Sequence, residues 1–246
     1  MSTNEQTLQG LTQLRLSGMQ NEYELILSNP KLKPDSQEAL LARLTQAELD
    51  WREKKRLKGA FKTAKLRIAN ACIENVDFSM ARGLDREVVA SLARCEWIGR
   101  NQNVILTGCS GTGKTHLACA LGNQAVRQGY TVLYKRLTQL LEELELAQAS
   151  GTLAKVRARI AKANLLILDD WGISPITATS RLHLLDVIEQ RTGNGSLIIT
   201  AQLPLTAWYD YIGEPTIADA ILDRVVHRAH KIELRGESMR KLKESV

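Results

Sequence analysis

The stretch that decides the fold lies near the middle of the chain and reads Gly108-Cys109-Ser110-Gly111-Thr112-Gly113-Lys114-Thr115. It has the spacing G-x-x-x-x-G-K-T, it follows the apolar run 103–107, and it precedes the helix-favouring run 116–121. This order of strand, glycine-rich loop and helix is the context in which the spacing forms a phosphate-binding loop. The glycines let backbone N–H groups converge on phosphate oxygens, and the helix N-terminus adds positive potential. We therefore expect a nucleotide-binding P-loop; the alternative is a glycine-rich turn that binds nothing.

The residues of this loop have expected roles in binding ATP and Mg²⁺. Lys114 would reach the β- and γ-phosphates, and the hydroxyl of Thr115 would be a ligand of Mg²⁺. The residues expected to contact the nucleotide are those of the loop and the next one along the chain: Gly108, Cys109, Ser110, Gly111, Thr112, Gly113, Lys114, Thr115 and His116.

A second chemical signal is a pair of acids that follows an apolar run, Asn164-Leu165-Leu166-Ile167-Leu168-Asp169-Asp170. Such a run predicts a buried strand, and parallel sheets bind their ligands at the carboxyl ends of the strands. Asp169 is therefore expected to hold Mg²⁺, directly or through water, and Asp170 is the candidate for polarising the attacking water. Many ATPases of this kind have Glu at the second position. Because Asp is shorter by a methylene group, we expect slow hydrolysis, or a nucleotide switch more than a motor.

Five apolar runs alternate with helix-favouring segments in the second part of the chain. Four of them are continuous, as is typical of strands that are covered on both faces. Strands that alternate with helices predict an α/β fold with a doubly wound sheet. The expected strands are 103–107, 130–134, 165–168, 197–200 and 230–234.

The residues before position 75 predict helices alone. Turn and capping residues at 31–36 separate a first helical part from a long helix that begins near Gln37. The helical pattern stops at Asn75-Val76-Asp77-Phe78. We therefore expect a small all-helical domain at 1–74 that binds DNA or a partner, followed by an ATPase domain at 75–246.

Charge and hydropathy restrict the class of protein. The 246 residues include 33 Lys and Arg against 27 Asp and Glu, a formal net charge of +6. No apolar run approaches the ~18–20 residues that a membrane-spanning helix needs, and the polar first residues do not have the pattern of a signal peptide. The four cysteines lack the spacing of a metal site. We therefore expect a soluble, cytoplasmic protein with no membrane partner and no metal beyond that of a nucleotide.

The positive charge is concentrated on one segment. Residues 51–67 contain eight Lys and Arg against one Glu, which exceeds the net charge of the whole chain. At helical spacing, Leu57, Phe61, Ala64 and Ile68 form an apolar stripe with a row of lysines beside it. Such a row suits sequence-independent contact with DNA phosphates, and a solvated helix face is the alternative. The expected DNA-binding residues are Lys54, Lys55, Lys58, Lys62 and Lys65.

A weaker basic group lies further along the chain. It consists of Lys155, Arg157, Arg159 and Lys162. It lines either a DNA path or the ordinary surface.

Several motifs occur together in this chain: Thr115-His116-Leu117-Ala118, the run from Leu165 to Gly172, the run from Ile199 to Pro204, the run from Ile221 to Arg228, and the run from Arg235 to Arg240. Together they resemble one known family, the IstB-like helper ATPases of insertion-sequence transposition, which are relatives of the DnaC-type helicase loaders within the AAA+ proteins. The resemblance implies a P-loop AAA+ domain with a five-stranded parallel sheet and an abbreviated C-terminal lid.

The resemblance also implies roles for residues outside the P-loop. Thr200, at a strand end, matches the polar sensor of the γ-phosphate, with Gln202 as the alternative. Arg224 resembles an arginine finger offered to the nucleotide of a neighbouring subunit, which implies a homo-oligomer with ATP at its subunit interfaces. The alternative for Arg224 is a surface arginine paired with Asp223 or Glu214. Arg240 matches the second sensor, and Arg191 either faces a neighbouring site or ends a solvated helix.

Together with this resemblance, the sequence features lead us to expect an ATP-dependent, DNA-binding AAA+ ATPase with ATP and Mg²⁺ as cofactors. It would assemble on duplex DNA and help the transposase of the same element to select or engage target DNA. A DnaC-like helicase loader in DNA replication is the first alternative, but aromatic residues make up only 4% of the chain, which disfavours stacking on single strands. A small-molecule kinase and an interaction protein with a merely structural nucleotide site are further alternatives.

Overall fold

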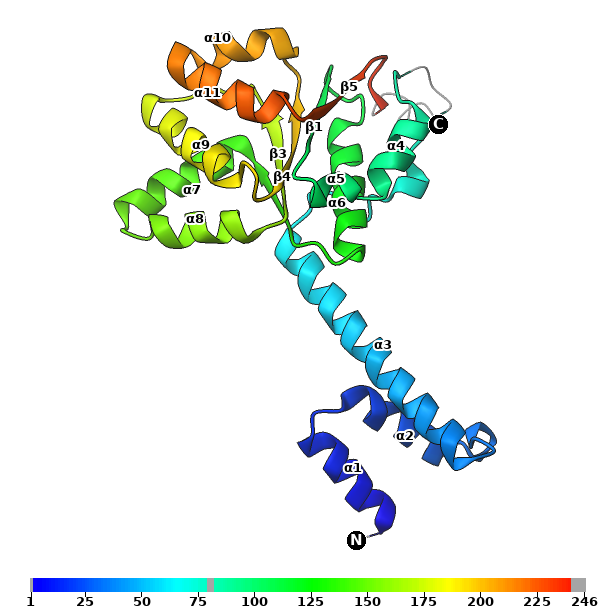
Figure 1. Cartoon of the computed structure of the whole chain (residues 1–246). Helices are drawn as coiled ribbons and strands as arrows, with labels where there is room; N and C mark the ends of the chain where they lie inside the picture. The colour runs from blue at the N-terminus through cyan, green and yellow to red at the C-terminus, as the bar shows by residue number, and fades with distance from the viewer. Residues whose placement is uncertain (1, 79–81, 240–246) are drawn as a thin grey trace. The chain divides into compact units, whose positions relative to one another are not determined.

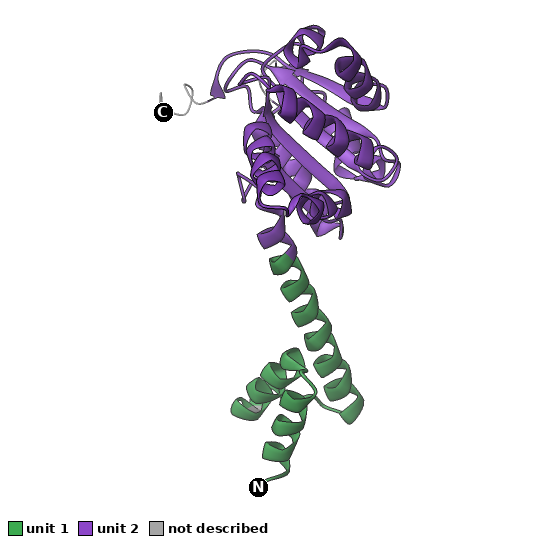
Figure 2. Ribbon diagram, turned by 90° about the vertical axis from the view of Figure 1, so that its left-hand side faces the viewer, with its two compact units in different colours: residues 1–59 green, residues 60–246 purple. Residues whose placement is uncertain are grey.

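The computed structural model describes residues 2–78 and 82–239. The chain divides into two compact units, Met1–Gly59 and Ala60–Val246, which are coloured separately in Figure 2. No helix in these described ranges is long and apolar enough to cross a membrane.

The first unit is built from helices, as expected. It contains α1 (Thr3–Gln13), α2 (Ser17–Ser28), the short η1 (Pro30–Leu32) and most of α3 (Gln37–Ala64). α2 and α3 touch at Gly18, where a Cβ atom would lie 2.4 Å from the carbonyl oxygen of Ala47. Beside this contact, the buried Glu48 carboxylate accepts the N–H of Gly18 at 2.7 Å. Glycine is therefore required at this crossing, because any side chain would separate the two helices.

The second unit contains a five-stranded parallel sheet with the order β2-β3-β4-β1-β5. Each strand overlaps one of the expected runs, with β2 two residues later than expected, and the continuous runs are buried on both faces, which confirms the α/β fold. The strands are β1 (Asn103–Gly108), β2 (Val132–Arg136), β3 (Leu165–Trp171), β4 (Ser196–Ala201) and β5 (Ala229–Leu234).

Helices cover both faces of this sheet, and Figure 1 shows α7 to α11 on one side and α4 to α6 on the other. The helices of the first layer are α7 (Leu137–Ala149), α8 (Leu153–Lys162), α9 (Ala178–Arg191), α10 (Trp208–Ile212) and α11 (Pro215–Val226). Those of the second are α4 (Arg86–Ala93), α5 (Glu96–Gly99) and α6 (Lys114–Arg127), and the short turns η2 (Ile73–Asn75) and η3 (Leu205–Ala207) complete the unit. The core therefore lies between buried strands and two helical layers.

The division between the units falls at Gly59, earlier than the expected boundary after residue 74. The segment after α3 packs on α6: a Cβ atom at Gly122 would lie 3.0 Å from the Leu66 side chain. The side-chain amide of Asn123 donates to the Ala69 carbonyl at 3.1 Å. Residues 60–74 therefore fold with the α/β unit, and α3 itself continues through Gly59 to Ala64.

Candidate nucleotide site

The P-loop joins the end of β1 to the start of α6, as the motif predicts. Gly108 has φ +141° and lies so close to β5 that a Cβ atom would meet the Leu234 carbonyl oxygen at 2.1 Å. The ammonium group of Lys114 donates to the carbonyl oxygens of Gly108 and Cys109, both at 2.7 Å. The loop therefore holds the lysine amine against its own backbone, at the N-terminus of a 14-residue helix.

The other loop residues differ in exposure. Cys109 and Ser110 are exposed, Thr112 is buried and donates its hydroxyl to the Cys109 carbonyl at 2.9 Å, and His116 is half-buried. Arg82, which belongs to no sequence motif described above, is buried beside the loop, with a guanidinium nitrogen 3.5 Å from the Thr112 carbonyl. Arg240 lies outside the described residues.

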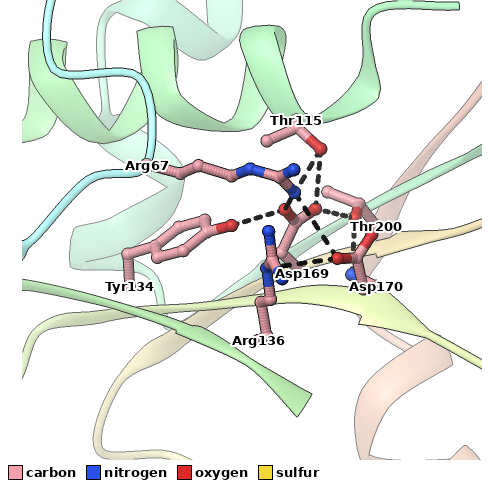
Figure 3. A network of polar contacts seen from close by, with 7 residues as sticks. All are labelled: Arg67, Thr115, Tyr134, Arg136, Asp169, Asp170 and Thr200. Carbon is pink, nitrogen blue, oxygen red and sulfur yellow. Dashed lines mark hydrogen bonds and ion pairs between the residues drawn. The ribbon is translucent and has the colours of Figure 1, made fainter. Parts of the chain in front are cut away.

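The carboxylate of Asp169 is the centre of a polar network that Figure 3 shows. Its side chain is completely buried and accepts hydrogen bonds from three hydroxyl groups. The hydroxyl of Thr115 donates to both carboxylate oxygens, at 2.9 and 3.1 Å, and those of Tyr134 and Thr200 donate to one oxygen each. The structure thus brings together Thr115, Asp169 and Thr200 from α6, β3 and β4, and adds Tyr134 from β2, which no sequence signal marked.

Asp170 lies on the same side of β3 as Asp169, although neighbouring residues of a regular strand point to opposite faces. Its φ of +64° and a register shift between Leu168 and Trp171 break the alternation. Its N–H donates to the Thr200 hydroxyl at 3.2 Å. Both acids of the pair therefore reach one site.

Two arginines flank the Asp170 carboxylate. A guanidinium nitrogen of Arg67 lies 3.5 Å from a carboxylate oxygen of Asp169 and 3.5 Å from one of Asp170. Arg136, at the end of β2, lies 3.5 Å from Asp170. Burial and the charge of Asp169 raise the pKa of Asp170 above its ordinary value, and Arg67, Arg136 and Lys114 act in the opposite direction. Arg67 was counted in the basic segment of the sequence, but its charge faces the two acids.

The oxygen atoms of Thr115 and Asp169 fit a magnesium ion. Mg²⁺ prefers hard oxygen ligands, and beside a nucleotide it usually takes one or two carboxylates together with phosphate oxygens and water. Here a hydroxyl and a carboxylate are already in contact at the N-terminus of the P-loop helix. Thr115 and Asp169 are therefore the residues that would hold the ion.

Arg224 lies far from the P-loop of its own chain. Its guanidinium donates to the Ala220 carbonyl at 2.8 Å and pairs with Glu189 at 2.9 Å, not with Asp223 or Glu214. Its carbonyl oxygen accepts from the side chain of Asn103, the first residue of β1, whereas the P-loop follows the last residue of that strand. Arg224 also lines a cavity of about 370 Å³. It is therefore at the opposite end of the sheet from its own P-loop.

Arg191, in contrast, is a structural residue. It is buried, and its guanidinium donates to the carbonyl oxygens of Ile160, Ala163, Asn164 and Ser196. Burial lowers its pKa to about 10, so it still carries its charge at neutral pH. Arg191 is the last residue of α9, but its side chain is buried and does not face solvent.

The basic segment separates into two kinds of residue. Arg52 pairs with Glu48, and Arg56 pairs with Glu53. The five lysines are exposed and form no ion pair with any described residue. The sequence predicts that Lys65 continues the helical row of lysines. In the structure α3 ends at Ala64, and Lys65, with φ +51°, lies just beyond the helix. The uncompensated charges are Lys54, Lys55, Lys58, Lys62 and Lys65.

The weaker basic group on α8 is partly neutralised. Arg157 pairs with Asp186, and Arg159 pairs with Glu143. Half of the charge that would have lined a DNA path is therefore engaged within the fold, which favours the ordinary-surface interpretation.

Comparison with known proteins identifies relatives along nearly the whole chain. The family model described as IstB-like ATP binding protein matches residues 9–246. A protein of Sinorhizobium fredii (strain NBRC 101917 / NGR234), named as an insertion sequence ATP-binding protein, is 43% identical over 235 residues, 96% of this chain and 96% of that protein. A protein of Pseudomonas aeruginosa, named as an insertion sequence IS21 ATP-binding protein, is 32% identical over 230 residues, 94% of this chain and 86% of that protein.

Solved structures share the fold of the α/β unit. The crystal structure of DnaI is similar with a TM-score of 0.59 and 22% identity, over 68% of this chain and 92% of that one. The crystal structure of the DnaC helicase loader is similar with a TM-score of 0.58 and 18% identity, over 68% of this chain and 97% of that one. The second unit therefore has the fold of an AAA+ domain.

Proposed function

Because the chain belongs to the family of IstB-like ATP-binding proteins of insertion sequences, we propose that it hydrolyses ATP and assembles on duplex DNA to help a transposase engage its target. The observation that carries the proposal is the buried Asp169 carboxylate, which Thr115 and Thr200 hold beside the P-loop. A carboxylate in this position, next to a P-loop lysine and a P-loop threonine, is the arrangement that phosphoryl transfer from a nucleotide requires.

The chain's own side chains divide the reaction among them. Lys114 exchanges its contacts with the Gly108 and Cys109 carbonyls for oxygens of the β- and γ-phosphates. Thr115 and Asp169 would hold Mg²⁺, which would supply charge neutralisation on the phosphates. Thr200, whose hydroxyl already bridges Asp169 and the Asp170 N–H, is placed to sense the γ-phosphate or the attacking water.

Asp170 is the group proposed to accept a proton from water. The water oxygen forms the new bond to the γ-phosphorus while the bond from that phosphorus to the β,γ-bridging oxygen breaks, giving ADP and phosphate. The released proton goes first to the Asp170 carboxylate. Burial and the Asp169 charge raise the pKa of Asp170, which makes its carboxylate a better proton acceptor than an exposed aspartate.

The position of Arg224 supports an assembled enzyme. An arginine at the far end of the sheet cannot reach the phosphates of its own chain, but it can serve those of a neighbour. A head-to-tail arrangement of subunits, which forms a ring or a helix, brings the two surfaces together. We propose that Arg224 stabilises the charge on the transferring phosphoryl group in such an assembly.

DNA binding is proposed for the helical unit and the end of α3. The five exposed lysines present charge that no described acid neutralises. Duplex DNA that neutralises such a row releases counterions, so binding is strong at low salt and independent of sequence.

The test compares DNA binding of the wild-type chain and the Lys114→Ala variant, with and without a non-hydrolysable ATP analogue. We expect the analogue to strengthen wild-type binding to duplex DNA, and duplex to compete better than single strands. The variant is expected to lose the response to the analogue. Better competition by single strands would support a helicase loader instead, and ATP turnover that neither DNA nor the substitution changes would indicate a merely structural nucleotide site.

A further inference from the structure

Arg67 links the basic end of α3 to the two catalytic carboxylates. It follows the last residue of α3, Ala64, by three positions, and two exposed lysines, Lys62 and Lys65, lie within five residues of it. Its guanidinium nitrogen lies 3.5 Å from both Asp169 and Asp170 (Figure 3). A segment proposed to bind DNA and the site proposed to bind ATP are thus joined through one side chain.

The backbone on both sides of Arg67 is anchored to the P-loop helix. Leu66 packs over Gly122 of α6, and the Ala69 carbonyl accepts the side-chain amide of Asn123 at 3.1 Å. On the other side, the N–H of Lys65 closes the last turn of α3 on the Phe61 carbonyl at 3.3 Å, and Lys65 then turns the chain with φ +51°. A change at the last turn of α3 therefore reaches Arg67 over a short and constrained path.

The contacts of Arg67 with the acids are long. A distance of 3.5 Å is at the limit of a hydrogen bond, so charge rather than bonding geometry holds the guanidinium there. The side chain is 36% exposed, and besides the two acids it interacts with the Tyr134 hydroxyl. A triphosphate and a divalent cation beside Asp169 change the charges that Arg67 faces, which gives its orientations different energies in the two nucleotide states.

We propose that Arg67 is a positioning residue that couples ATP binding at Asp169 to DNA binding at the end of α3. The proposal rests on the function proposed above, because it needs both ligands. Arg67 acts through its neighbours: the nucleotide state sets its position, and its position sets that of Lys62 and Lys65 at the end of α3. Coupling of this kind is reciprocal, so DNA bound at the lysines also strengthens binding of the nucleotide.

The chain offers a matched control in Arg136. This residue contacts the same Asp170 oxygen at the same distance of 3.5 Å, but it is the last residue of β2 and lies about seventy positions from the end of α3 in the chain. Removing Arg136 takes the same charge from the same acid. A general electrostatic effect on the site would therefore appear in both variants, whereas a loss of coupling is expected only for Arg67.

The experiment measures the affinity for a fluorescent DNA duplex by anisotropy, with and without saturating non-hydrolysable ATP analogue and Mg²⁺. The ratio of the two dissociation constants is the coupling factor, and coupled sites in proteins typically give about 5- to 150-fold. We expect the factor to fall to about one in Arg67→Ala, to be intermediate in Arg67→Lys, and to stay near the wild-type value in Arg136→Ala. Binding of the analogue by itself and thermal unfolding are measured for each variant.

The outcomes separate the inference from the function on which it rests. An Arg67→Ala variant that keeps the wild-type factor overturns the role of Arg67, and so does an Arg136→Ala variant that loses coupling to the same degree. Wild-type protein that binds duplex with no response to the analogue overturns the coupling and leaves DNA binding in place. Wild-type protein that binds no duplex overturns the proposed function itself. If Arg67→Ala does not fold, the coupling factor of Arg67→Lys is compared with that of the wild type instead, and an unchanged factor overturns the role of Arg67.

Discussion

Replacing Tyr134 by phenylalanine tests whether the hydroxyl groups around Asp169 hold the site together. Tyr134 is only 6% exposed, and its hydroxyl donates to the completely buried Asp169 carboxylate. The substitution keeps the ring and removes this one donor, so Asp169 retains the hydroxyls of Thr115 and Thr200. A hydrogen bond to a charged group contributes ~1.5–3 kcal/mol, and we expect Tyr134→Phe to reduce the free energy of unfolding by that amount.

The assay is urea unfolding of the whole chain, followed by tryptophan fluorescence. The stacked pair Trp171 and Trp208 lies 4.8 Å apart in the core of the α/β unit and reports on the part of the chain that contains Tyr134. If the slope of the free energy of unfolding against urea concentration is the same in wild type and variant, the substitution has changed the stability and not the surface exposed on unfolding. The control is Tyr209→Phe, because the Tyr209 side chain is 39% exposed to water and is expected to contribute little.

The pH dependence has a definite sign. Burial and the hydrogen bond to Asp169 raise the pKa of the Tyr134 hydroxyl above its ordinary value. An acid whose pKa is higher in the folded state contributes full stability below its unfolded pKa and loses it as the pH rises through its folded pKa. The difference between wild type and variant should therefore be constant near neutral pH and shrink only above about pH 10. A difference below about 0.5 kcal/mol, or one equal to that of Tyr209→Phe, would refute the reasoning.

Three further experiments test other parts of the molecule. Arg224→Ala should leave ATP binding intact and abolish turnover, and mixing it with Lys114→Ala protein should restore activity at shared sites; no recovery would contradict an arginine supplied between subunits. Gly18→Ala, where a Cβ would lie 2.4 Å from a backbone oxygen, should destabilise the helical unit by ~1–3 kcal/mol in chemical unfolding, whereas Gly10→Ala, with nothing within 4 Å, should stabilise it slightly. Neutralising the exposed lysines Lys54, Lys58 and Lys62 should reduce the steepness of log affinity for DNA against log salt concentration by up to ~0.9 for each lost phosphate contact. An unchanged slope would show that these lysines do not contact DNA.

The sequence predicted those parts of the site whose structure depends on residues close together in the chain. The spacing from Gly108 to Thr115 specifies a loop between a strand and a helix, because the turn, the phosphate cradle and the helix N-terminus all lie within eight consecutive residues. The five strands were predicted because each is a short apolar run bounded by helical segments, and a parallel sheet buries such runs on both faces. The place of Asp169 and Thr200 at one edge of the sheet follows from the same rule, because parallel strands end together.

The rest was decided by tertiary structure, because it depends on contacts between residues that are far apart in the chain. Arg67 looked like one more cation of a basic segment, yet it pairs with acids about a hundred positions away. Arg191 was interpreted as a possible solvated helix end, but its side chain is buried among four backbone carbonyls. The sequence predicted only that Tyr134 lies in a strand, but in the structure its hydroxyl donates a hydrogen bond to the Asp169 carboxylate. The sequence shows which side chains are charged or polar, but only the folded structure determines which partner each of them meets. The physical reason is that a buried charge or polar group is costly unless a hydrogen-bond or ionic partner lies beside it, and these partners come from distant parts of the chain.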